Sequence, residues 1–139
     1  MPGIAFLLLG LGVVLLIIFG SRLQARRRLP EEANQVPLYS DWCSGSTRAP
    51  GAVSGGFRFY SNLPTCRITL YEHGVVLALG KPIFVKYGDI SSASWKKSWV
   101  ARYIDLSLYE PQIRATLNVG APEKVAEILR QKGVEVSDP

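Results

Sequence analysis

Histidine and cysteine are scarce in this chain, and their scarcity excludes the common metal sites. One histidine and two cysteines occur in 139 residues. Cys43 and Cys66 form no C-x-x-C pair, whereas a structural zinc ion takes about four Cys or His ligands. The sequence therefore predicts no metal site. Cys66 alternates with Ile68 and Leu70, which is typical of a small core residue on a strand.

Catalytic signatures are missing as well. The chain holds no G-x-S-x-G motif, no P-loop and no glycine-rich dinucleotide fingerprint. His73 falls in a turn between two apolar stretches, where an exposed turn residue is a simpler interpretation than a catalytic base. The carboxylates of Asp89, Asp105 and Glu110 are scattered, and Asp89 suits a turn. We therefore expect no enzymatic activity and no bound cofactor.

Charge is absent from residues 2–20, which are apolar throughout. As an α-helix such a segment spans roughly 28 Å, close to the thickness of the hydrocarbon core of a bilayer. A helix also satisfies its own backbone polar groups in lipid. We therefore predict a transmembrane helix over residues 2–20. Because it carries no charge, this helix alone is no path for ions or protons.

A cleaved signal peptide is the alternative for this segment. Such a peptide starts with basic residues and ends in a small-x-small cleavage site. Here no basic residue precedes the apolar run, and four arginines follow it: Arg22, Arg26, Arg27 and Arg28. We therefore predict a retained signal-anchor, with the N-terminus outside and the soluble part in the cytoplasm. The same arginines suit anionic headgroups, which we interpret as anchoring.

The excess of positive charge is largely local. The chain has 16 basic and 11 acidic residues, a net charge of +5. Removing the four arginines of the membrane flank from the 16 leaves 12 basic against 11 acidic residues, or +1. Nucleic-acid binding requires a basic patch on the folded domain. The charge therefore favours membrane anchoring, and we expect no nucleic acid as a partner.

Residues 21–55 resemble a basic juxtamembrane segment followed by a flexible linker, because Pro, Gly and Ser recur there without apolar periodicity. Tyr39 and Trp42 interrupt this composition. They either pack on the following domain or add a short first strand. If the soluble part is cytoplasmic, both cysteines are expected to be reduced thiols.

From residue 56 the pattern changes to short apolar stretches separated by turn residues. The predicted strands are 57–60, 66–71, 75–79, 83–86, 90–97, 103–108 and 113–119. Pro122 suits the first position of a helix, and Val125, Ile128 and Leu129 form one apolar stripe. The sequence thus predicts a mainly-β domain over residues 56–136, with about seven antiparallel strands and a C-terminal helix.

This order resembles bacterial pleckstrin-homology-like (PH-like) domains. The residues that carry the resemblance are 69–77, 83–86 and 87–92, with the succession of strand, acidic-x-Gly turn, strand and Tyr-x-Asp-Ile that related GRAM domains share. The resemblance implies a curled antiparallel sheet or partial barrel, capped by the C-terminal helix. Phosphoinositide-binding members carry several Lys and Arg around the first inter-strand loop. The corresponding predicted loop, 61–64, has none, so that activity is not carried over.

One segment combines aromatic and basic residues in a predicted hairpin. Its candidate contact residues are Trp95, Lys96, Lys97, Trp99 and Arg102. Such side chains suit the headgroup region of a membrane or a protein partner. The alternative, which the sequence favours, is that both tryptophans cap the sheet core and the lysines lie in a solvated turn.

Together these features predict a membrane-tethered, non-enzymatic binding or scaffolding module with an unidentified protein partner. One alternative is a lipid-surface sensor that reads anionic headgroups, and another is an accessory subunit of a larger membrane complex that adds a partner's strand to an exposed sheet edge. A scaffold predicts an apolar groove between the helix and a sheet edge. A lipid sensor predicts that both tryptophans, both lysines and the arginine of the hairpin are exposed together.

Overall fold

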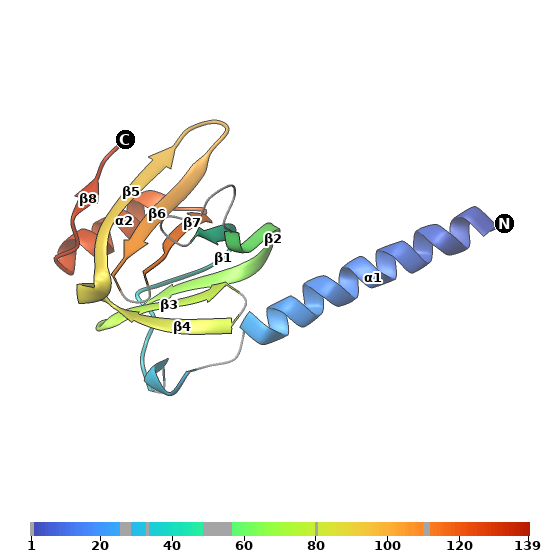
Figure 1. Cartoon of the computed structure of the whole chain (residues 1–139), viewed down its shortest axis with the longest axis horizontal. Coiled ribbons are helices and arrows are strands. Elements are labelled where there is room, and N and C mark those ends of the chain that lie inside the picture. Colours follow the sequence, from blue (N-terminus) through green and yellow to red (C-terminus); the bar gives the residue numbers. More distant parts are fainter. Residues whose placement is uncertain (1, 26–28, 33, 49–56, 80, 110–111) are drawn as a thin grey trace.

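A single long helix, α1 (Pro2–Ala25), projects from a β-rich domain in the computed structural model (Figure 1). The structure describes residues 2–25, 29–32, 34–48, 57–79, 81–109 and 112–139. Within α1 the window Gly3–Gly20 has a mean hydropathy of 2.8, and none of it is buried in the protein. The predicted apolar helix is confirmed, and it has the length and composition of a membrane span.

The described part of the domain forms one sheet of eight strands, in the order β4-β3-β2-β1-β7-β6-β5-β8. The strands are β1 (Tyr39–Arg48), β2 (Phe57–Leu70), β3 (Gly74–Leu79), β4 (Lys81–Lys86), β5 (Ile90–Lys97), β6 (Arg102–Leu108), β7 (Arg114–Asn118) and β8 (Val136–Ser137). Neighbouring strands are antiparallel except for β8, which pairs in parallel with β5. The prediction of one helix followed by a mainly-β domain with a C-terminal helix is therefore confirmed.

Buried and exposed side chains alternate along the strands, as the sequence predicts. On β6, Ile104, Leu106 and Leu108 are buried, while Tyr103 and the other residues between them stay partly exposed. A strand sends successive side chains to opposite faces, so this pattern places one face on the core. Strands β3 to β7 begin and end within two residues of the predicted ranges.

The N-terminal boundary of the domain differs from the prediction. Residues 39–48, assigned to the flexible linker, form β1, which pairs with both β2 and β7. A 3-10 helix, η1 (Pro30–Glu32), precedes it. The domain therefore extends well before residue 56, and the interpretation of Tyr39 and Trp42 as part of a first strand is the correct one.

The predicted turn at 61–64 is also wrong, because β2 runs through it. Between Cys43 and Gly45 β1 advances two residues, while β2 advances five, from Cys66 to Ser61. This irregularity holds Pro64, which has no N–H to donate to a ladder, so the turn signal marks a bulge in a strand. Residues 49–56, which connect β1 to β2 in the sequence, lie outside the described residues.

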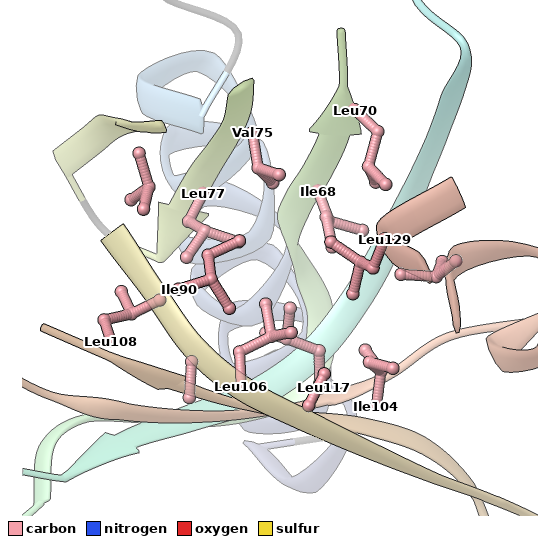
Figure 2. Packing of buried hydrophobic residues seen from close by; sticks show 14 of the residues in the cluster. Ile68, Leu70, Val75, Leu77, Ile90, Ile104, Leu106, Leu108, Leu117 and Leu129 are labelled. Atoms are coloured by element: carbon pink, nitrogen blue, oxygen red, sulfur yellow. The ribbon is translucent and has the colours of Figure 1, made fainter. Parts of the chain in front are cut away.

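The core lies between the curled sheet and α2 (Pro122–Gln131), which covers β5 and β6 (Figures 1 and 2). Its fully buried side chains include Ile68, Leu70, Leu77, Ile104, Leu106, Leu117 and Leu129. Burying a side chain of this size contributes about 1.5–3 kcal/mol. Gly133, with φ of +85°, ends the helix in the left-handed conformation that favours glycine.

Cys43 and Cys66 lie directly opposite each other across β1 and β2, and both are buried free thiols. Desolvation raises the pKa of the Cys43 thiol, and the neighbouring Cys66 adds to the effect. Burial likewise raises the pKa of the Cys66 thiol. Both side chains therefore act as small core residues at neutral pH, as the sequence predicts for Cys66.

Strand β1 packs closely on β7 at Gly45. A Cβ atom there would lie 2.5 Å from the carbonyl oxygen of Thr116 and 2.9 Å from a methyl carbon of Leu117, whereas a Cβ at Gly88 meets nothing within 4 Å. We expect Gly45→Ala to lower the free energy of unfolding by about 1–3 kcal/mol through overpacking, and Gly88→Ala to change it by less than about 0.5 kcal/mol. Urea unfolding of the full chain in detergent micelles measures both. Equal effects would contradict the close approach of the two strands.

Candidate functional site: the β5–β6 hairpin

The turn between β5 and β6 presents two apolar side chains directly to solvent. The backbone N–H of Ser98 donates to the carbonyl of Ala101 at 2.7 Å, and the N–H of Ala101 donates to the Ser98 hydroxyl at 3.2 Å. These bonds close the turn around Trp99 and Val100, which are 104% and 95% exposed. A fully exposed tryptophan gains none of the free energy that burial of its ring would contribute, which makes Trp99 and Val100 candidate contact residues.

Basic side chains surround these two residues. Lys96, Lys97 and Arg102 are exposed, and Lys97 and Arg102 line a shallow hollow of about 350 Å³ together with Ser98 and Trp99. Lys97 donates from Nζ to Oε1 of Glu123 at 3.0 Å, which offsets part of the positive charge. No acidic residue occurs between positions 96 and 102. We refer to residues 96–102 as the hairpin tip.

Trp95 has a different role from Trp99. It is partly buried against the core, and its Nε1–H donates to Oδ1 of Asp138 at 2.9 Å. The same oxygen accepts from Nη2 of Arg130 at 2.8 Å. Four of the five predicted contact residues thus lie exposed together at the tip, and the fifth supports its base. The favoured expectation that both tryptophans cap the core is right in part for Trp95 and wrong for Trp99.

Carboxylates fix the base of the hairpin to the C-terminal part of the chain. The hydrogen bond from Trp95, followed by that from Arg130, holds the pKa of Asp138 below its usual value. The pKa of Glu123 is lowered by its backbone hydrogen bond and by Lys97. Both groups are therefore anionic at neutral pH, and they connect β5 with α2 and the C-terminus.

A second constellation ties the start of the domain to the sheet. Glu32 is 2% exposed, and its carboxylate accepts from the backbone N–H of Leu29 at 2.7 Å and from the Tyr71 hydroxyl at 2.8 Å. Nη2 of Arg67 lies farther away, at 3.5 Å. The backbone N–H of Leu38 also donates to the carbonyl of Leu70 at 2.7 Å. We call this set the Glu32 latch, since it holds the segment after α1 against β2.

The Glu32 latch shows that the prediction of a flexible linker is wrong for this segment. No signal in the sequence points to these contacts. Glu32 stands in a Pro-Glu-Glu stretch that resembles a solvated surface segment. Its partners Arg67 and Tyr71 follow 35 and 39 residues later, so the fold alone brings them together. Of the predicted membrane-flank arginines, Arg22 belongs to α1, and Arg26, Arg27 and Arg28 lie outside the described residues.

Another hollow, of about 490 Å³, lies beside the connection of β6 and β7. Its lining includes Arg48, Ser91, Tyr109 and Arg114. Arg114 is already engaged, because its Nε and Nη2 donate to the Asp105 carboxylate at 3.0 and 2.6 Å. Within the described ranges, no group of three or more His, Cys, Asp or Glu side chains gathers as metal ligands would.

We expect the Glu32 latch to stabilise the domain. Glu32→Ala leaves the Tyr71 hydroxyl and the Leu29 N–H without their acceptor, so we expect the free energy of unfolding to fall by about 1–3 kcal/mol. Hydrogen exchange at the amides of Leu29 and Leu38 should also accelerate. The full chain in lipid nanodiscs is the sample, and Glu135→Ala, an exposed carboxylate near the C-terminus, is the control. Unchanged exchange in Glu32→Ala would show that the latch does not hold this segment.

We expect the contacts of Asp138 with Trp95 and Arg130 to weaken at acidic pH. Because this pKa is lowered from 3.8 in the folded chain, the stabilisation is present above about pH 4 and is lost as the pH falls through the folded pKa. We expect the indole N–H signal of Trp95, followed by NMR, to move on acidification below pH 4. Asp138→Asn should remove that step, while Glu135→Gln should retain it. A step that persists in Asp138→Asn would assign the effect to another group.

No family model matches the chain, and no curated protein matches it. Among solved structures, the chain is similar to the crystal structure of the C-terminal domain of an unknown protein from Leishmania infantum, with a TM-score of 0.47 and 12% sequence identity, over 88% of this chain and 96% of that chain. At this level of similarity no function can be transferred between the two.

Proposed function

We propose that the chain is a single-pass membrane protein that presents a non-enzymatic, PH-like binding module at the cytoplasmic face of a bacterial inner membrane. The observation that carries the proposal is the separation of two apolar surfaces. The window Gly3–Gly20 of α1 is wholly unburied outside the domain, while Trp99 and Val100 are exposed on the domain itself. The first suits a bilayer interior and the second a binding surface.

The topology of the sheet supports the PH-like assignment. Seven strands curl from β4 to β5 through the order β4-β3-β2-β1-β7-β6-β5, and α2 follows β7 as the resemblance implies. The loop between β1 and β2 carries no Lys or Arg within residues 49–56, with Arg48 and Arg58 on either side. Phosphoinositide binding at that loop is therefore not part of the proposal.

Cytoplasmic orientation rests on charge. The four arginines of the membrane flank follow the apolar run, and positive charge favours the cytoplasmic side.

The hairpin tip is a better binding surface than the sheet edges. Beside α2, β8 already pairs with β5 at Ala93 and Ser94, which fills the edge where a scaffold would need a groove. At the opposite edge, β4 carries Lys81, Pro82 and Lys86, residues that discourage pairing with another strand. These observations favour the hairpin over strand addition, which remains the alternative for an accessory subunit.

An added cysteine tests the tether and its orientation together. Tyr109 is exposed, whereas the two native cysteines are almost wholly buried, so Tyr109→Cys creates a selective label site. We expect a membrane-impermeant maleimide to label it in inside-out vesicles and not in intact spheroplasts, and the protein to resist carbonate extraction. Wild-type protein is the control for the native thiols. Labelling of spheroplasts would overturn the orientation, and release by carbonate would overturn the tether.

A further inference from the structure

We propose that the hairpin tip docks on the anionic headgroups of the same bilayer that holds α1, as a second membrane contact made by one molecule. The proposal rests on the proposed tether and goes beyond it, because the domain would lie on the membrane in a fixed orientation. Trp99 and Val100 would occupy the interface. Lys96 and Arg102 would face lipid phosphates.

The chemistry of the tip matches a headgroup region. An indole ring has an apolar body and one N–H donor, so it favours the boundary between lipid and water. Trp99 and Val100 are almost fully exposed side by side at the turn. The neighbouring cations are attracted to anionic lipid. No residue of the tip itself is acidic, and the nearby Glu123 carboxylate of α2 is paired with Lys97.

The position of the tip relative to α1 supports a contact with the same bilayer. In Figure 1, α1 leaves the domain toward the right, and the turn between β5 and β6 stands at the upper right of the domain. Near the domain, α1 contacts β2 and β4. The Glu32 latch begins at Leu29, so few residues separate the helix from the sheet. The domain is therefore held close to the membrane.

The tip is also supported from behind. Lys97 is joined to Glu123 on α2, and Trp95 is joined to Asp138 near the C-terminus. Hydrogen bonds between Ser98 and Ala101 close the turn. A surface that is ordered before binding loses less conformational entropy on binding, so this support favours docking.

Fluorine NMR on the full chain provides the test. Incorporation of 5-fluorotryptophan gives one signal each for Trp42, Trp95 and Trp99, and Trp99→Phe identifies the third. The chain is placed in nanodiscs of neutral phosphatidylcholine, with or without phosphatidylglycerol, that contain a headgroup spin-labelled lipid. We expect the Trp99 signal to lose most of its intensity in anionic nanodiscs, and the Trp95 signal to lose much less.

A charge-reversal variant serves as the matched comparison. Lys96→Glu combined with Arg102→Glu reverses the charge of the tip while Lys97 and Glu123 themselves are kept, and it should restore the Trp99 signal. An unchanged Trp95 signal shows that the hairpin remains folded. High salt should also restore Trp99, because it screens exposed charges.

Two results would overturn lipid docking, and a third would overturn the proposed tether. If Trp99 keeps its intensity in anionic nanodiscs while Trp95 remains native, lipid docking is wrong and the tether stands. If Trp99 responds only as the protein concentration rises, a second copy of the chain occupies the tip, and docking is again wrong. If the chain fails to enter nanodiscs, the proposed tether itself fails.

Discussion

Strand β1 pairs with β2 along one side and with β7 along the other, and so joins the two halves of the sheet. The rest of the structure depends on this pairing. It requires Gly45, since no Cβ fits between β1 and the backbone of β7. It also places Cys43 and Thr47 on the buried face, where the core closes. Without β1, the β5–β6 hairpin and the strands near α1 would belong to separate sheets.

The same strand decides how α1 is attached to the domain. Because β1 begins at Tyr39, the segment between α1 and the sheet is short, and part of it is fixed by the burial of Glu32. A buried carboxylate is costly unless its oxygens are paired, and here two short hydrogen bonds satisfy them. The segment between α1 and β1, which resembles a linker in the sequence, is thus attached to the domain through the paired Glu32 carboxylate.

Most of the domain could be predicted from the sequence, because β3 to β7 and α2 show clear apolar periodicity. β1 could not, because its buried face is made of Cys43, Gly45 and Thr47, which carry a weak hydrophobic signal. The turn predicted at 61–64 fails for a related reason: a proline and an asparagine mark a bulge as readily as a turn. Glu32 was missed since its partners come from distant strands.

Tertiary contacts, and not the local sequence pattern, decide which of the two hairpin tryptophans is buried. Both stand beside lysines, and their spacing alone does not separate them. Trp95 is held because Asp138, near the C-terminal end, accepts a hydrogen bond from its indole N–H, and because its side chain packs against the core. Trp99 lies beyond the last pair of the ladder, Lys97 and Arg102, where the described structure offers it no such neighbour. An indole left there gains free energy by leaving water, and in the proposed arrangement the bilayer that holds α1 is the nearest apolar phase.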